Sequence, residues 1–112
     1  MRSGVLSMLD LEWRSRAHLD RESIVIYIGV EQENPKAALA TIRRIDEAVR
    51  FAREFPDAGG WLIRNELGHK YRTVLANPYT IYYRFDEQVL TVYRVLHQHQ
   101  DLDTYTLVSL GD

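Results

Sequence analysis

The chain has 112 residues, a net charge of −2, 46% hydrophobic residues and 27% charged residues. This length allows one hydrophobic core, and the composition is that of a globular protein. The chain contains no cysteine, which excludes disulfides, cysteine-bound zinc and thiol nucleophiles. We expect one domain over residues 1–112 in the cytoplasm, because no apolar stretch resembles a signal peptide or a membrane span.

The N-terminal third predicts a strand followed by a helix. Met8–Trp13 alternates apolar and acidic side chains, as a half-buried strand does. Arg16–Val30 is ambiguous, because its β-branched run Ile24–Ile28 favours a strand by propensity. The length of this segment and its charged turn at residues 20–22 favour a helix, which is our prediction.

The next segment predicts an amphipathic helix. Asn34 is a good N-cap, and Pro35 suits the first helical position. Apolar residues then recur at spacings of three and four until about Glu54, where Phe55-Pro56 ends the helix. The apolar stripe consists of Ala38, Ile42, Ile45, Val49 and Ala52. The two helices should form an antiparallel hairpin.

The second half of the chain predicts an antiparallel sheet. Four segments rich in β-branched and aromatic residues are separated by short turn sequences. They are Trp61–Asn65, Tyr71–Ala76, Tyr79–Phe85 and Val89–Leu96, with Thr104–Leu110 as a weaker edge strand. A strand, a helical hairpin and then an antiparallel β-meander predict an α+β fold.

Several local sequences, taken in this order, resemble the RelE/ParE superfamily of toxins, and the ParE branch in particular. The resemblance runs from about residue 11 to residue 102, with residues 1–8 and 103–112 as terminal extensions. It rests on Leu11-Glu12-Trp13, Asn34-Pro35, Arg64-Asn65-Glu66-Leu67-Gly68, Tyr71-Arg72, Ile81-Tyr82-Tyr83-Arg84, Arg94-Val95-Leu96-His97 and Asp101-Leu102. It implies a growth-inhibiting toxin of a bacterial type II toxin–antitoxin system, of the kind that stabilises plasmids, neutralised by a cognate antitoxin.

The resemblance implies two different activities on one scaffold. ParE-like toxins inhibit DNA gyrase without known catalytic chemistry, whereas RelE- and YoeB-like toxins cleave messenger RNA on the ribosome. Ribonuclease chemistry needs a general base, a general acid and cations, and Glu66, Arg72 and His97 resemble the corresponding YoeB-like residues. Gln98, however, stands where those toxins carry a catalytic tyrosine. We therefore favour a non-catalytic gyrase inhibitor over an endoribonuclease, and an inactive antitoxin-binding scaffold is the third alternative.

Some of these residues also have simpler interpretations. Glu66 and Arg72 suit a surface ion pair between neighbouring strands, which would contribute little to stability. His97 and His99 share a strand face, but two imidazoles without further ligands make a poor metal site. We expect no metal and no cofactor.

Exposed aromatic and basic side chains should contact the target or partner, because such residues dominate protein interfaces. Trp13 and Trp61 suit the core or its edge, and either becomes a partner anchor if it is exposed. The expected partners are the antitoxin and gyrase. For the endoribonuclease alternative, the expected target is the ribosome with messenger RNA. A homodimer is a further alternative. The expected contact residues are Trp61, Arg72, Tyr82, Arg84, Arg94 and His99.

Overall fold

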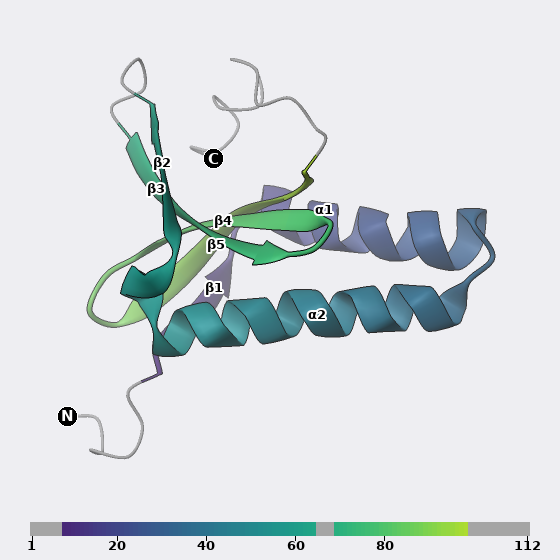
Figure 1. Ribbon diagram of the computed structural model, residues 1–112, viewed down its shortest axis with the longest axis horizontal. Coiled ribbons are helices and arrows are strands. Elements are labelled where there is room, and N and C mark those ends of the chain that lie inside the picture. Colours follow the sequence, from purple (N-terminus) through teal and green to yellow (C-terminus); the bar gives the residue numbers. More distant parts are fainter. Residues whose placement is uncertain (1–7, 65–68, 99–112) are drawn as a thin grey trace.

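The computed structural model describes residues 8–64 and 69–98. Along the chain, one strand is followed by a helical hairpin and then by four strands (Figure 1). They are β1 (Asp10–Trp13), α1 (Ser15–Ile26) with the π-helical turn η1 (Tyr27–Glu31), α2 (Pro35–Glu54), the 3₁₀ turn η2 (Pro56–Ala58), β2 (Gly60–Arg64), β3 (His69–Ala76), β4 (Tyr79–Phe85) and β5 (Val89–His97). The predicted α+β fold is confirmed. The predicted strand Thr104–Leu110 lies outside the described residues.

The five strands form one sheet in the order β1-β5-β4-β3-β2. β2 to β5 are antiparallel neighbours, as predicted from their short connections. β1 pairs in parallel with β5, from Asp10 opposite Val89 to Trp13 opposite Val92. The helical hairpin connects β1 to the meander, and its closed end projects beyond the strands in Figure 1.

α2 follows its sequence signals closely. The Asn34 side chain accepts a hydrogen bond from the backbone N–H of Ala37 at 3.1 Å, and Pro35 occupies the first turn. Four residues of the stripe pack in the core between α2 and the sheet: Ile45 is fully buried, Val49 and Ala52 are buried, and Ile42 is half-buried. Ala38 is also buried, but it lies beside Gly29 of η1. The helix ends at Glu54, so both of its predicted boundaries are confirmed.

The ambiguous segment is helical. Within its β-branched run, Ile24 is buried, whereas Val25, Ile26 and Tyr27 are exposed. Only one side of the segment therefore faces the core, and packing of that side against β5 and α2 overrides the strand propensity of the run. The other side leaves large apolar side chains on the protein surface.

Apolar clusters lie on both faces of the sheet. The larger cluster joins the helices to the sheet and contains Ile45, Tyr83 and Val92, which are 0% exposed. The smaller cluster, on the opposite face, contains Tyr71, Tyr82 and Leu96. The alternation along β4 thus sends Tyr83 to the helices and Tyr82 to the other side.

Candidate functional site

Arg72 on β3 supports an exposed tryptophan on β2. Its guanidinium lies 3.6 Å from the ring centroid of Trp61, the residue opposite it in the antiparallel register. Nη1 of Arg72 also donates to the carbonyl oxygens of Asp57 and Gly59, each at 2.9 Å. The Arg72 side chain is 13% exposed, whereas Trp61 is 56% exposed. The stacked guanidinium therefore holds the indole as a rigid surface platform.

The turn behind this platform is fixed from the core. The hydroxyl of Tyr83 donates to the carbonyl oxygen of Pro56 at 2.8 Å. Gly59 has no room for a side chain, because a Cβ there would lie 2.5 Å from the Tyr83 hydroxyl oxygen and 2.6 Å from the Thr73 carbonyl oxygen. Burial raises the pKa of the Tyr83 phenol, and the positive charge of Arg72 opposes that shift. η2 and the start of β2 thus have little freedom to move.

Arg72 is therefore paired with a residue that the sequence did not suggest. Its Nη2 lies 3.4 Å from the carboxylate of Asp57, on the turn that precedes β2. The predicted partner, Glu66, lies outside the described residues, as does His99. The sequence analysis expected Trp61 to act as an anchor only if it is exposed. Its exposure depends on packing, which the sequence does not show.

Arg94 on β5 is bound to α1. Its Nε and Nη2 donate to the two carboxylate oxygens of Asp20 at 2.7 Å and 3.0 Å. The backbone N–H of Val95 donates to the same carboxylate at 2.9 Å. Both side chains of the ion pair are about 15% exposed. A contact between Arg94 and a target stays a prediction, and the described contacts give Arg94 a structural role.

An aromatic and basic row crosses the sheet face opposite the helices. The Tyr71 and Tyr93 rings meet edge to face at 5.3 Å between centroids, and Arg84 lies 5.8 Å from the Tyr71 ring. Arg14 lies 5.4 Å from the Tyr93 ring. Arg84 is exposed, whereas Tyr82 is only 7% exposed, and burial raises the pKa of the Tyr82 phenol. Of these two predicted contact residues, Arg84 is therefore the accessible one.

His97 lies at the other end of the sheet from Arg72. Its ring meets the Tyr79 ring edge to face at 5.4 Å, beside a cleft of about 320 Å³ that α1 closes on one side. Arg72 is opposite Tyr83 on β4 and His97 is opposite Tyr79, four residues away. At about 3.4 Å per strand residue, this separates the two positions by about 14 Å along the sheet. The structure does not bring Arg72 and His97 together.

The residue after His97 is occupied within the fold. Nε2 of Gln98 donates to the side-chain oxygen of Asn77 at 2.8 Å, and its backbone N–H donates to the carbonyl oxygen of Pro78 at 2.8 Å. Gln98 thus ties the end of β5 to the turn between β3 and β4. The amide has no titratable proton to transfer at this position.

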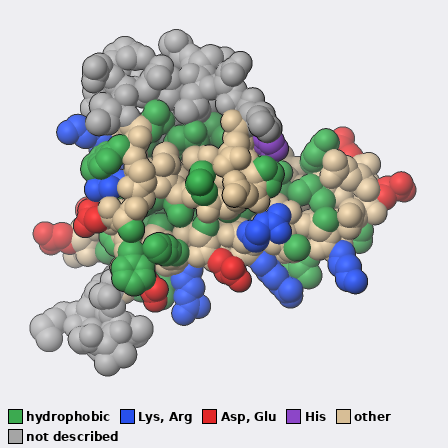
Figure 2. Space-filling view, viewed as in Figure 1, with side chains coloured by type: hydrophobic (Ala, Val, Ile, Leu, Met, Phe, Trp, Pro, Cys, Tyr) green, Lys and Arg blue, Asp and Glu red, His purple; other side chains and the backbone are tan. Residues whose placement is uncertain are grey.

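An apolar depression of about 420 Å³ lies between the two helices, and we call it the hairpin groove. None of its lining residues is charged: they are Val25, Gly29, Val30, Pro35, Ala38, Leu39 and Ile42. Val30 is 69% exposed and Leu39 is 52% exposed. In Figure 2, hydrophobic side chains are visible over this projecting end of the hairpin, at the right. The sequence carried a signal for this surface, because residues 24–28 are too apolar for one helix face.

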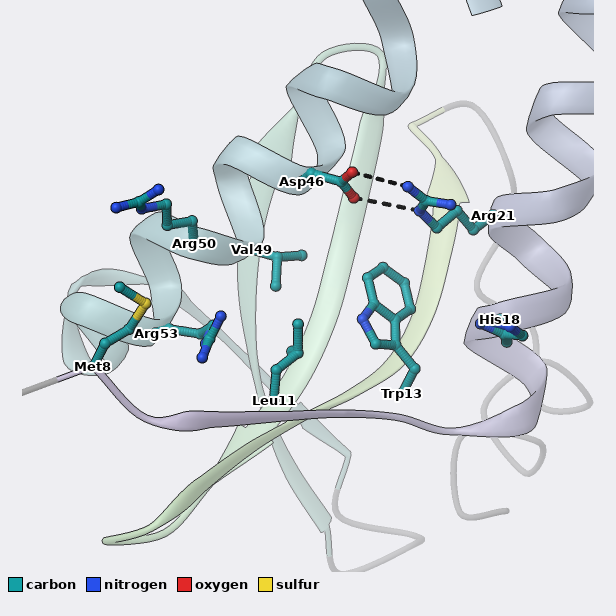
Figure 3. Close-up of a pocket in the computed structure, with 9 residues that line it drawn as sticks. All are labelled: Met8, Leu11, Trp13, His18, Arg21, Asp46, Val49, Arg50 and Arg53. Carbon is teal, nitrogen blue, oxygen red and sulfur yellow. Dashed lines mark hydrogen bonds and ion pairs between the residues drawn. The ribbon is translucent and has the colours of Figure 1, made fainter. Parts of the chain in front are cut away.

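A second depression, the β1 groove, lies between β1 and the two helices (Figure 3). It encloses about 600 Å³ and is lined by Met8, Leu11, Trp13, His18, Arg21, Asp46, Val49, Arg50 and Arg53. Leu11 and Trp13 rise from β1 toward Val49 on α2. Across the groove, Arg21 donates to both carboxylate oxygens of Asp46, at 3.3 Å and 2.8 Å. No motif in the sequence indicated this groove, because three separate elements form it.

Within residues 8–64 and 69–98, no group of three or more histidine, aspartate or glutamate side chains could hold a metal ion. Over the same residues, no helix combines the length and the apolar character needed to cross a membrane.

Comparison with known proteins identifies a family. Residues 11–102 match the model of a family described as the ParE toxin of the type II toxin–antitoxin system parDE. A solved structure described as a chromosomal ParDE TA system from P. aeruginosa is similar in fold, with a TM-score of 0.60 at 18% sequence identity. The match covers 82% of this chain and 98% of that one. No curated protein sequence matches the chain.

Proposed function

The chain belongs to the ParE toxin family of type II toxin–antitoxin systems, and from that membership we propose that it inhibits DNA gyrase by binding and is neutralised by its antitoxin. The proposal places this action in the cytoplasm, where gyrase works. We propose that the inhibition works by binding and not by catalysis. The two must be distinguished because a fold does not fix a function, and ribonucleases share this scaffold.

The separation of Arg72 and His97 is the observation that carries this proposal. A general acid or base must come within hydrogen-bond reach of the reacting atoms, and a cation must lie beside the phosphate. Here the strand positions of the two residues lie about 14 Å apart along the sheet. The Arg72 guanidinium is also engaged by backbone carbonyls and by the Trp61 ring. This arrangement supports a structural use of Arg72 and argues against a shared catalytic centre.

Trp61 is the residue that we assign to target contact. Tryptophan is enriched among the side chains that contribute most binding energy at interfaces. The indole is exposed, yet Arg72 already fixes its orientation, so binding would order few side-chain torsions. This combination suits an anchor that inserts into a pocket of a protein target.

The hairpin groove is the docking site that we assign to the antitoxin. Its lining is apolar, and the exposed side chains around it form a strip along two helices. An amphipathic helix or an extended apolar segment of a partner can bury such a strip. The groove therefore fits a flexible antitoxin segment that folds as it binds.

A supercoiling assay with two variants tests the target contact. Purified wild-type protein should inhibit supercoiling by gyrase, and Trp61→Ala should weaken the inhibition at least tenfold, as loss of an anchor worth about 1.4 kcal/mol or more would do. Leu75→Ala is the matched control, because Leu75 is equally exposed, at 59%, on the opposite sheet face. Equal inhibition by all three proteins would remove Trp61 from the interface, and no inhibition by any of them would refute gyrase as the target.

A further inference from the structure

We infer that the β1 groove is a second peptide-binding site, which takes an acidic, extended polypeptide segment as an added strand on the open edge of β1. This site differs in place and chemistry from the apolar hairpin groove. The inference therefore stands whether or not gyrase is the target and wherever the antitoxin docks.

Among the described residues, β1 pairs with another strand on one edge only. β1 is the last strand of the sheet, and its inner edge pairs with β5 through alternate residues, with Asp10 N–H donating to Gln88 and Arg14 N–H donating to Val92, both at 2.9 Å. In a strand, the backbone N–H and C=O groups of successive residues point to opposite edges. The N–H and C=O of Leu11 therefore point to the outer edge of β1. Those of Trp13 do the same. Among the described residues, none pairs with these groups.

The two helices bound this edge at its two ends. At Leu9, Arg53 of α2 occupies the outer edge: its carbonyl oxygen accepts from Leu9 N–H at 3.2 Å, and its Nε donates to Leu9 C=O at 2.7 Å. Arg53 thus stands where a neighbouring strand would begin. At the other end, α1 starts at Ser15. Within residues 8–64 and 69–98, the open edge is therefore a short slot with two unused donor–acceptor pairs, which matches a peptide backbone.

Side chains from β1 and from both helices surround the slot. Leu11 and Trp13 form an apolar floor beneath Val49, so an added strand can insert apolar side chains on this face (Figure 3). The groove also contains three arginines and one aspartate, and that aspartate is already paired with Arg21. Neither Arg50 nor Arg53 forms an ion pair with any described residue.

The charge around the groove selects the occupant. α2 carries five basic and three acidic residues, and basic side chains, with acidic ones between them, project along the lower margin of Figure 2, where Figure 1 shows α2. Arg50 and Arg53 favour glutamate or aspartate on the bound segment, by complementary charge. A nucleic acid would meet the same arginines, but a phosphodiester chain cannot pair with the N–H and C=O groups of Leu11 and Trp13. The observations therefore favour an acidic peptide.

Intrinsic fluorescence measures occupancy of this groove directly. The chain contains two tryptophans, so Trp61→Phe leaves Trp13 as the single reporter inside the groove. The probe is a peptide of about six residues that alternates glutamate and valine, long enough to pair with a short edge strand. Binding should change Trp13 emission and slow the hydrogen exchange of the Leu11 and Trp13 amides. The absence of both changes at millimolar peptide would overturn the inference.

Two N-methylated peptides test the strand addition itself. One carries methyl groups on the odd backbone nitrogens and the other on the even ones, so each lacks the donors of one edge. Only one edge of an added strand pairs with β1, and we expect one of the two peptides to lose binding while the other retains it. Equal binding by both peptides would show that the backbone of the probe is not paired.

Charge reversal on α2 tests the recognition of acidic side chains. In the Trp61→Phe background, Arg50→Glu should weaken binding of the alternating peptide about tenfold, as loss of a rim charge pair with added repulsion would do. Arg43→Glu is the matched control, because Arg43 is exposed on the same helix but outside the groove. Equal loss in both variants would mean nonspecific attraction. Displacement of the peptide by an equimolar single-stranded DNA would instead assign the groove to nucleic acid.

Discussion

Asp20 on α1 and Arg94 on β5 form a two-point ion pair, with oxygen–nitrogen distances of 2.7 Å and 3.0 Å. The same carboxylate accepts the backbone N–H of Val95, next to the point on β5 where pairing with β1 ends at Val92. Asp20 thus replaces the missing strand neighbour and fixes α1 against the sheet. Loss of the carboxylate would leave a largely buried guanidinium and a backbone donor without these acceptors.

We predict that Asp20→Ala lowers the free energy of unfolding by about 2 to 4 kcal/mol, since it breaks a mostly buried charge pair. Denaturant unfolding followed by circular dichroism measures the change. Asp46→Ala is the control, because the Arg21–Asp46 pair has side chains that are 31% and 50% exposed and should contribute about 0.5 kcal/mol or less. Equal losses in the two variants would contradict this account of the Asp20 contact.

The α2 stripe gives a prediction about the core. Ile45 is 0% exposed between α2 and the sheet, so Ile45→Ala should cost roughly 2 to 5 kcal/mol of stability. Leu75→Ala removes a similar apolar side chain that is 59% exposed and should change stability by about 0.5 kcal/mol or less. Thermal and denaturant unfolding of both variants measures the difference. A loss below about 1 kcal/mol for Ile45→Ala would mean that this site does not hold the core together.

Local sequence signals predicted the helices and strands. Features that depend on contacts between distant residues could not be predicted from the sequence. Asn34 and Pro35 act within one turn of the chain, so the start of α2 could be read directly from the sequence. The pairing of β1 with β5 joins residues about 80 positions apart, and no local pattern specifies it. The exposure of Trp61 and the β1 groove likewise depend on how distant elements pack. The candidate site was therefore less predictable than the elements that carry it.

The hairpin groove gives a prediction about the antitoxin. Leu39→Glu places a charge in an apolar groove, and we expect it to weaken antitoxin binding at least a hundredfold, because the bound state would bury an unpaired carboxylate. Leu39 is 52% exposed in the free chain, so its stability should change little. Titration calorimetry with the cognate antitoxin measures the loss, and Leu75→Glu is the matched control. Unchanged affinity in Leu39→Glu would exclude the hairpin groove as the docking site.

The buried tyrosines give a prediction about alkaline pH. Burial raises the pKa of Tyr71, Tyr79, Tyr82 and Tyr83 above the ordinary value of 10.0. The unfolded chain therefore releases these phenolic protons at lower pH than the folded chain does. This stabilisation is complete below pH 10 and is lost as the pH rises through the folded-state values. The unfolding midpoint should fall steeply above pH 10 at constant ionic strength.

Ultraviolet absorbance of tyrosinate provides the direct check of that shift. Tyr71, Tyr79, Tyr82 and Tyr83 should ionise at higher pH in the native protein than in the denatured chain. Coincident titration curves for the native and denatured protein would contradict the expected effect of burial.

A side-by-side assay of gyrase supercoiling and of cleavage of ribosome-bound messenger RNA, with wild type and His97→Ala, distinguishes binding from catalysis. General acid–base groups typically contribute about 10² to 10⁴ in rate, so a ribonuclease that uses His97 would lose nearly all cleavage in the variant. We predict that both proteins inhibit supercoiling to a similar extent and that neither cleaves messenger RNA. Cleavage by wild type that disappears in His97→Ala, with gyrase unaffected by both proteins, would contradict this prediction.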